Sequence, residues 1–288
     1  MYRYINPGRI ALFQNTPGTN YSETTNRTYT KTGVGFVCDS WMLLPKIPAG
    51  TKEMWAKLDY WNGRSDSYTR LGFRFKSAST YCGAGAGSNA WLYINGSGKQ
   101  QIQTVINAIN QFWFHIKSGS SDGVFEMYLN GVKAYEFTGN VLNGADITSI
   151  DLCSSNTTSL YTLSNIIVAD SAISLTEQVA IIPCTITTDM TQNQDGSYSA
   201  TAVNQTLEYA IDASGFDAGT KFTGVNIAAR NCIRDGEGVN EFEFLEGTTS
   251  LDTQSIPTAE NCGISHGITL NEESPATFAL YNYKLKAK

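Results

Sequence analysis

The sequence predicts an all-β protein built from two antiparallel sandwich domains. Residues 124–129 and 132–137 alternate between apolar and polar side chains, and Asn130-Gly131 separates them. Asn-Gly between two alternating runs is a strong signal for a β-hairpin with a two-residue turn. Charged residues make up only 16% of the chain and 26 glycines are present, which is typical of turn-rich β structure.

The length and the distribution of tryptophan predict two domains. The chain has 288 residues, which is long for one sandwich, and all five tryptophans lie within the first 113. A polar Thr176-Glu177-Gln178 sequence follows an apolar run that ends near residue 169. We therefore predict a larger sandwich over residues 1–176 and a smaller one, for attachment or assembly, over residues 177–288. Strands of the second domain are expected at residues 221–229, 240–245 and 277–286.

Period-2 alternation also marks two runs of the first domain, residues 54–61 and 70–76, on either side of a polar loop. We predict that these runs pair as a hairpin with one apolar side that faces the core. The other side is the predicted binding surface, and it carries Trp55, Asp59, Trp61, Arg70 and Arg74.

Three interpretations of this surface are open. Tryptophan rings offer flat apolar surfaces to sugars, and arginines offer a fork of donors to hydroxyls or to acidic glycans. The same residue types anchor protein–protein interfaces. The third interpretation is a solvated sheet face on which Asp59 pairs with an arginine at little energetic gain. The secondary structure of residues 101–109 is undecided from the sequence, since they fit either a short helix or a strand.

Several strands of the first domain, taken in order, carry a resemblance to a known fold family. Residues 112–117 form an aromatic strand that contains Trp113, and a later strand ends in Asn130-Gly131-Val132. The sequence Ile166-Ile167-Val168-Ala169-Asp170 closes the unit. In that order these strands resemble the concanavalin A-like (laminin G-like) jelly-roll sandwich. Sandwiches of this kind host lectins, hydrolases and structural modules, so the resemblance implies a fold and not a function.

The second domain extends the resemblance to a two-part protein of tailed bacteriophages. In those proteins a laminin G-like domain precedes a β-rich domain with strands similar to residues 224–230, 242–245 and 275–280 of this chain. An acidic turn follows the first of these strands, here Arg234-Asp235-Gly236-Glu237. This chain departs from the pattern at Asn231-Cys232, where the family continues with basic or polar residues.

The resemblance implies a non-enzymatic structural protein of a phage virion, placed in a tail, a fibre or a capsid appendage or decoration. Such a protein is made in the host cytoplasm, and its expected partners are other virion proteins and further copies of itself. Host attachment through cell-surface glycans is expected with this role. The alternative is a lectin-like carbohydrate-binding protein without a virion role.

No catalytic residues are predicted, and we expect that the chain is not an enzyme. Laminarinase-type hydrolases carry a Glu-x-Asp-x-x-Glu or Glu-x-Asp-x-Glu strand that places its carboxylates on one face. The near match at Glu241 and Glu243 lacks the aspartate, and it fits the outward side of a strand whose other side is aromatic. The only histidines, His115 and His266, fall in different domains, which leaves little room for a catalytic triad.

No cofactor and no metal are predicted. The chain has no Cys-x-x-Cys and only two histidines, which argues against a structural zinc site. Asp59, Asp66 and Asp122 have the oxygen chemistry that calcium prefers, but they form no spaced loop motif. The glycine-rich residues 83–89 are not followed by Gly-Lys-Ser/Thr, and they fit either a surface loop or a ligand-binding loop.

Charge and hydropathy exclude two classes of partner, and the cysteine positions indicate the state of the thiols. The net charge is −6 and no basic run is present, so we expect no nucleic acid partner. No window approaches the roughly 20 apolar residues that cross a bilayer, and the N-terminus lacks a signal peptide, so we expect no membrane partner. The six cysteines fall three on each side of the predicted boundary, which predicts free and mostly buried thiols.

Overall fold

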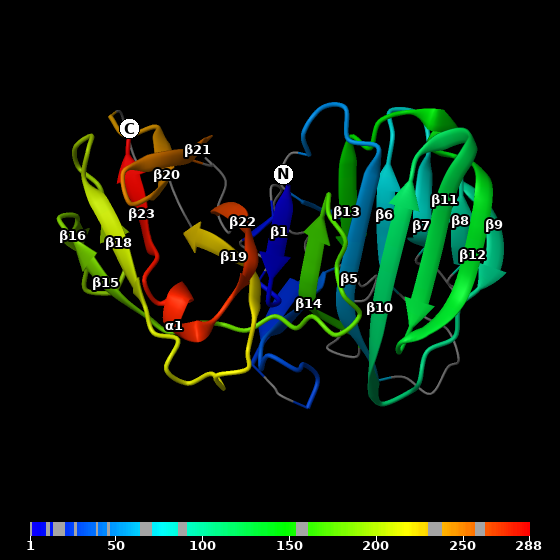
Figure 1. Cartoon of the computed structure of the whole chain (residues 1–288), viewed down its shortest axis with the longest axis horizontal. Helices are drawn as coiled ribbons and strands as arrows, with labels where there is room; N and C mark the ends of the chain where they lie inside the picture. The colour runs from blue at the N-terminus through cyan, green and yellow to red at the C-terminus, as the bar shows by residue number, and fades with distance from the viewer. Residues whose placement is uncertain are drawn as a thin grey trace. The chain divides into compact units, whose positions relative to one another are not determined.

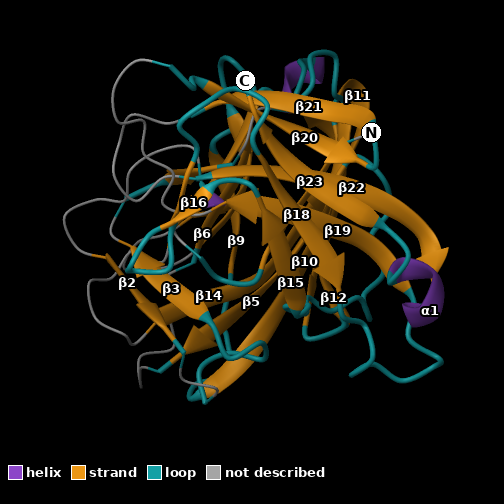
Figure 2. Ribbon diagram, turned by 90° about the vertical axis from the view of Figure 1, so that its left-hand side faces the viewer, coloured by secondary structure: helices purple, strands orange, loops and turns teal. Residues whose placement is uncertain are grey.

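The structure is a computed structural model that describes residues 2–9, 12–13, 21–25, 28–38, 40–44, 47–63, 71–85, 91–153, 161–229, 238–256 and 263–288. Strands dominate these residues (Figure 2). The described residues contain one α-helix, α1 (Pro275–Phe278). Within the described ranges, no helix has the length and apolar character needed to cross a membrane. The predicted all-β class is confirmed.

The chain divides into two compact units, Met1–Ala180 and Ile181–Lys288. The predicted boundary lies a few residues earlier, between residues 176 and 177. Residues 171–180, which we call the covering segment, belong to the first unit because they pack on it. Ile173 and Val179 of this segment are buried in a small apolar cluster of the first unit.

The first unit contains two antiparallel sheets with a core between them (Figure 1). The eight-stranded sheet has the order β12 (Val132–Val141), β11 (Gly119–Leu129), β10 (Ala108–Lys117), β5 (Glu53–Asn62), β14 (Tyr161–Ala169), β3 (Gly35–Cys38) and β2 (Tyr21–Thr24), and β1 (Arg3–Asn6) also pairs with β14. The six-stranded sheet has the order β4 (Met42–Leu43), β13 (Ser149–Cys153), β6 (Gly72–Lys76), β7 (Tyr81–Gly85), β8 (Trp91–Ile94) and β9 (Ser97–Gln101). A short 3-10 helix, η2 (Leu142–Gly144), follows β12.

The core between the two sheets is aromatic. Phe73 and Phe75 of β6 and Phe112 and Phe114 of β10 have no exposed surface, and Phe73 stacks on Phe114 with ring centroids 5.0 Å apart. Successive side chains of a strand point to opposite faces, so each core residue alternates with a residue on the outer side of its sheet. We call these outer sides the eight-stranded face (Trp55, Lys57, Asp59, Trp61, Gln111, Trp113, His115 and Glu126) and the six-stranded face (Trp41, Gly72, Arg74, Lys76, Tyr81, Gly85, Trp91, Tyr93 and Asp151).

The hairpin predicted at Asn130-Gly131 is confirmed. Strands β11 and β12 pair with Leu129 opposite Val132, which leaves these two residues as the turn. Their φ angles are 54° and 81°, and a type I′ turn requires positive φ at both central residues. The Asn130 side-chain oxygen also accepts a hydrogen bond from the main-chain N–H of Gln111 at 2.8 Å, which ties the turn to β10.

The hairpin predicted for residues 54–76 is wrong. Strand β5 pairs with β10 and β14 in one sheet, whereas β6 pairs with β7 and β13 in the other. The two strands bury alternate residues in the same core from opposite sides. Alternation has the same period in both arrangements, so it cannot distinguish strands that face each other across a core from strands that share hydrogen bonds.

Two smaller predictions concern an irregular segment and the cysteines. Residues 102–107 are neither helix nor strand, because β9 ends before them and Asn107 has a φ of 55°. The four described cysteines are not joined in disulfides; Cys38, Cys82 and Cys153 are buried and Cys184 is exposed. The other two cysteines lie outside the described residues.

The second unit contains one larger sheet and two strand pairs. The five-stranded sheet has the order β15 (Cys184–Thr188), β18 (Thr206–Ile211), β23 (Asn282–Ala287), β20 (Glu241–Glu246) and β21 (Thr249–Ser255). The pairs are β16 (Thr191–Gln192) with β17 (Tyr198–Ser199), and β19 (Phe222–Ala229) with β22 (Ile264–Glu273). Their core includes Phe222, Phe244, Phe278 and Leu285.

The strands predicted at residues 221–229 and 240–245 correspond to β19 and β20. The strand predicted at residues 277–286 is wrong in its first half, because α1 comes before β23 there. Ser274 caps this helix by accepting a hydrogen bond from the Thr277 amide, and Pro275 occupies its first turn. Both are favourable helix-start features that the alternation pattern does not reveal.

Candidate functional site

The structure separates the predicted binding residues onto two faces. Trp55, Asp59 and Trp61 lie on β5 in the eight-stranded face, and Arg74 lies on β6 in the six-stranded face. Arg70 lies outside the described residues. The single binding surface that we predicted is therefore wrong, because it depended on pairing β5 with β6.

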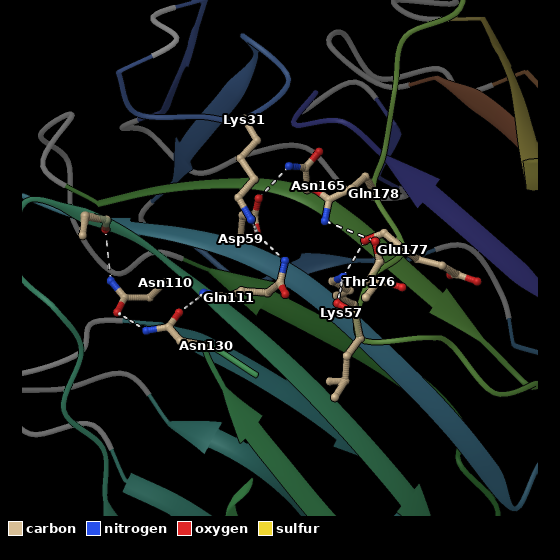
Figure 3. Close-up of polar contacts among 12 residues, drawn as sticks. Lys31, Lys57, Asp59, Asn110, Gln111, Asn130, Asn165, Thr176, Glu177 and Gln178 are labelled. Atoms are coloured by element: carbon tan, nitrogen blue, oxygen red, sulfur yellow. Dashed lines mark hydrogen bonds and ion pairs between the residues drawn. The ribbon is translucent and has the colours of Figure 1, made fainter. Parts of the chain in front are cut away.

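Asp59 is the buried centre of a polar network on the eight-stranded face (Figure 3). Its carboxylate accepts hydrogen bonds from Asn165 Nδ2 at 2.6 Å and from Gln111 Nε2 at 3.3 Å, and Lys31 Nζ lies 3.6 Å away. A buried carboxylate without such partners is strongly destabilising. The network meets this requirement within the fold, and the described partner charge is a lysine and not the predicted arginine.

The covering segment lies over another part of this face. Lys57 Nζ donates to two main-chain carbonyls of the segment, those of Leu175 and Glu177 (Figure 3). Trp113 Nε1 donates to a third carbonyl, that of Ile173, at 2.8 Å. These hydrogen bonds hold the covering segment against the sheet, and they close this part of the face to a ligand.

The two tryptophans predicted to bind are also engaged within the protein. Trp55 stacks on His115 with ring centroids 4.7 Å apart and an interplanar angle of 8°. Trp61 is 7% exposed and packs against Tyr29 at a centroid distance of 4.1 Å. Neither ring presents the open flat surface that binding a sugar requires.

His115 joins β10 to the strands on both of its sides. Its Nε2 lies 2.8 Å from Glu53 Oε1 and its Nδ1 lies 3.0 Å from Glu126 Oε2. Glu126 also accepts a hydrogen bond from Lys133 at 2.6 Å. Burial acts to raise the pKa of Glu126, but hydrogen bonds from Lys133 and His115 outweigh it and lower the pKa. These contacts give His115 a structural role in joining the strands of the sheet.

Arg74 is held on the six-stranded face by two kinds of contact. Its Nε and Nη2 donate to the Asp151 carboxylate at 3.0 and 3.1 Å, and Lys76 Nζ lies 3.4 Å from the same group. The guanidinium carbon lies 3.3 Å from the ring centroid of Trp41 and 5.3 Å from that of Tyr81. Bidentate pairing and stacking both suit a planar guanidinium, and together they fix its orientation.

Glycines make room for aromatic rings on this face. A Cβ atom on Gly72 would lie 2.5 Å from the Trp41 ring, and one on Gly85 would lie 2.2 Å from the Tyr93 ring. Both distances are shorter than real Cβ contacts, so any larger residue would displace the ring. The glycines therefore allow both rings to lie close against the sheet.

Trp91 and Tyr81 extend this arrangement. Trp91 of β8 is 37% exposed, and its ring lies 3.4 Å from the position of a Cβ on Gly98. Burial and the neighbouring Tyr93 raise the pKa of Tyr81 against a smaller opposite effect of Arg74, so its hydroxyl is a hydrogen-bond donor at neutral pH. We call the whole set the aromatic–arginine platform, and it consists of Trp41, Arg74, Tyr81, Trp91 and Tyr93.

Sequence reasoning found only Arg74 of the platform. A usable signal was present in residues 81–85, where a tyrosine and two glycines occupy alternate positions and predict a strand with room for neighbouring rings. We interpreted residues 83–89 as a glycine-rich loop, but Gly83–Gly85 belong to β7. Residues 86–89 lie outside the described residues.

The candidate calcium ligands do not converge. Asp59 is buried on β5, Asp122 is exposed on β11, and Asp66 lies outside the described residues. Across the described ranges, no group of three or more His, Cys, Asp and Glu side chains is placed to hold a metal ion.

The near match to hydrolase carboxylates lies on β20 in the second unit. Glu241 is exposed, whereas the Glu243 side chain is 11% exposed and pairs with Lys288 Nζ at 3.0 Å. Hydrogen bonds from Ser250 and Lys288 lower the pKa of Glu243. A carboxylate that is kept ionised in this way is a poor general acid at neutral pH.

Comparison with known proteins concerns the fold. The sequence matches neither a protein-family model nor a curated protein. Domain 4 of an extracellular arabinanase from Geobacillus stearothermophilus, in complex with arabinotriose, is 18% identical over 58% of this chain and 81% of that chain, with a TM-score of 0.36. The catalytic domain of a family 131 glycoside hydrolase from Coprinopsis cinerea is 13% identical over 60% and 85%, with a TM-score of 0.34. A galectin from Caenorhabditis elegans is 10% identical over 58% and 95%, with a TM-score of 0.31.

These comparisons correct one expectation. We expected from the missing catalytic motif that the chain is not an enzyme, but similar structures include the catalytic domain of a glycoside hydrolase. The missing Glu-x-Asp-x-Glu strand excludes only the laminarinase-type arrangement of catalytic carboxylates. Sandwich folds also host enzymes with other catalytic residues. The exclusion of enzymatic activity is therefore withdrawn.

Proposed function

We propose that this chain is a carbohydrate-binding structural protein of a bacteriophage virion, and that it contacts host-surface glycans through the aromatic–arginine platform. The platform is the observation that carries the binding part of this proposal. It combines exposed aromatic surface at Trp91 with a fixed guanidinium at Arg74. The second unit serves attachment to other virion proteins or to further copies of the chain.

The chemistry of sugars fits the platform. A sugar ring has apolar C–H faces that stack on aromatic side chains, and a rim of hydroxyls that accept hydrogen bonds from donors such as arginine. Arg74 is already oriented by Asp151 and Trp41, so little side-chain freedom is lost when a ligand binds. The eight-stranded face lacks a donor that is both fixed and available. Its donors Asn165 and Lys57 already bind Asp59 and the covering segment.

The virion part of the proposal is supported by the order of the two domains in the sequence. Two of the three segments that resemble the phage proteins correspond to β19 and β20 of the second unit, whereas the third, residues 275–280, begins with the helix α1. A second compact unit that follows the sandwich in the chain suits a protein in which one part binds and the other assembles.

The binding part is tested with a glycan array followed by calorimetry on the intact protein. We expect Trp91→Ala to weaken binding by about tenfold or more. The matched control is Trp55→Ala, which removes a tryptophan from the opposite face and should leave the affinity unchanged. Circular dichroism checks that both variants fold. A wild-type protein that binds no glycan, or an equal loss in both variants, would contradict the proposal.

The virion part is tested by electron microscopy of phage particles labelled with an antibody against this chain. We expect labelled tails, fibres or capsids, and a purified protein that elutes above the 31.4 kDa of one chain. Intact glycan binding without labelled particles would favour the alternative, a lectin-like protein with no virion role. Flanking capsid, portal or baseplate genes give an independent readout of the same question.

A further inference from the structure

We propose that the ligand of the aromatic–arginine platform is an acidic saccharide, whose carboxylate pairs with Arg74. This inference rests on the proposed carbohydrate-binding function and names the class of glycan. Three features of the six-stranded face lead to it, namely the unused donors of Arg74, the charge of the sheet and the aromatic rings that lie within reach of Arg74.

Arg74 has more donors than the protein uses. A guanidinium carries five N–H groups, and the hydrogen bonds to Asp151 use two of them. No other acceptor of Arg74 is present among the residues that the structure describes, and its side chain is 21% exposed. The remaining N–H groups match a carboxylate, which accepts two parallel hydrogen bonds and is held about twice as strongly as a neutral acceptor.

The charge of the six-stranded sheet favours an anion. Its six strands contain four charged residues, Arg74, Lys76, Lys99 and Asp151, of which only the last is acidic. Asp151 is 2% exposed and lies within 4 Å of both Arg74 and Lys76, so it offsets only part of their charge. The sheet is therefore locally basic although the chain has a net charge of −6. A neutral sugar gains nothing from this excess, whereas an acidic sugar is attracted by it.

Aromatic rings extend from Arg74 across the six-stranded face. Gly83 of β7 lies opposite Arg74, and Tyr93 of β8 lies opposite Gly83. The Tyr81 ring lies beside this row, with its centroid 5.3 Å from the Arg74 guanidinium carbon and 5.5 Å from the Tyr93 ring centroid. Two strand spacings, about 10 Å, separate Arg74 from Tyr93, so a sugar stacked on either ring can reach Arg74 with its carboxylate. Trp91, next to Tyr93 on the same face, offers a second ring to a longer oligosaccharide.

The test compares ligands that differ only in charge. Calorimetry measures binding of short oligosaccharides of galacturonate, mannuronate/guluronate and sialate to the intact protein, each as the free acid and as its methyl ester. We expect at least one free acid to bind about tenfold or more tightly than its ester. We also expect this preference to weaken as salt is raised from 50 to 500 mM, since salt screens exposed charges.

Two variants assign the preference to Arg74. Arg74→Lys keeps the charge beside Asp151 but loses the fork of donors, and Arg74→Gln loses both. We expect the ratio of acid to ester affinity to fall in Arg74→Lys and to approach one in Arg74→Gln. Lys117→Gln removes an exposed lysine from the opposite sheet, and it should keep the wild-type ratio. Circular dichroism confirms folding, and Arg74→Lys remains informative where Arg74→Gln does not fold.

The outcomes separate this inference from the proposed function. Equal affinity for acids and esters, or binding of neutral glycans alone, overturns the acidic ligand while carbohydrate binding stands. An acid preference that Arg74→Lys and Arg74→Gln both retain overturns the role of Arg74, as does equal binding of an acidic peptide. A wild-type protein that binds no saccharide, acidic or neutral, overturns the proposed function itself.

Discussion

The eight-stranded and six-stranded faces of the first sandwich arise from the same alternation, but they differ in what they leave free. On the eight-stranded face, Asp59 and Lys57 are buried and their polar atoms bind other parts of the chain. On the six-stranded face, Arg74 keeps unused donors beside an exposed Trp91. Both faces contain tryptophan, acidic and basic residues, so residue type alone does not distinguish them.

The difference shows that a binding surface is recognised by polar groups whose hydrogen-bonding capacity the fold has not already used. A donor or acceptor that already serves the fold cannot bind a ligand without leaving its own partner unsatisfied. A second criterion is the presence of glycines opposite the aromatic rings. On the six-stranded face these glycines let the rings lie close against the sheet. On the eight-stranded face the covering segment lies over part of the sheet instead. The following predictions test this contrast, from the largest expected effect to the smallest.

Removing the buried carboxylate should have the largest effect. Asp59→Ala leaves Asn165 and Gln111 without their acceptor, so we expect the free energy of unfolding to fall by about 3 kcal/mol. Urea denaturation measures this change. Asp122→Ala removes an exposed carboxylate from β11 and should stay within about 0.5 kcal/mol of the wild type. Similar small changes in both variants would contradict the view that the eight-stranded face is closed by its own contacts.

The burial of Lys57 predicts a pH dependence. Burial lowers its pKa from 10.5 to about 8, although Asp59 acts to raise it. The unfolded chain therefore binds the proton more tightly between these values, and wild-type stability should rise from pH 8 to pH 10.5 by about 2–3 kcal/mol. Lys57→Met lacks this dependence, so the measured quantity is the difference in unfolding free energy between the two proteins at each pH. A constant difference would indicate that Lys57 is well hydrated.

A glycine on the six-stranded face should be more sensitive than one in open space. Gly85→Ala places a Cβ where the Tyr93 ring lies, and we expect a loss of stability of about 1–2 kcal/mol together with weaker glycan binding. Gly215→Ala is the control, because nothing lies within 4 Å of its added Cβ. Unchanged binding in Gly85→Ala would exclude the Tyr93 ring from the platform.

Local features of the sequence predicted part of this structure correctly. The Asn130-Gly131 turn was predictable because positive φ at two adjacent residues favours Asn and Gly. The sheet assignment of residues 54–76 was not predictable, since period-2 alternation is the same for strands on either side of a core. The platform was mostly missed because Trp41, Arg74, Tyr81 and Tyr93 come from separate segments of the chain. Only the order of strands in the sheet brings these residues together.

The smallest effect should come from the ion pairs at the edge of the eight-stranded face. The pKa of Glu126 is lowered because hydrogen bonds from Lys133 and His115 outweigh the opposing effect of burial. Ionised Glu126 therefore stabilises the folded protein at neutral pH, and this contribution is lost as the pH falls through its folded pKa. We expect Glu126→Gln to lower the unfolding free energy at pH 7 by less than about 1 kcal/mol, with no difference from the wild type in acid.

Raising the salt concentration should reduce the Glu126→Gln effect at pH 7 further, because the Lys133 partner is exposed. The Asp59→Ala effect should respond much less to salt, since its carboxylate is buried among its donors. An equal salt response of the two variants would contradict this distinction. Buried polar contacts such as those of Asp59 are costly to break, so they close a face to ligands. Exposed ion pairs such as Glu126–Lys133 cost little to break, so they do not close it.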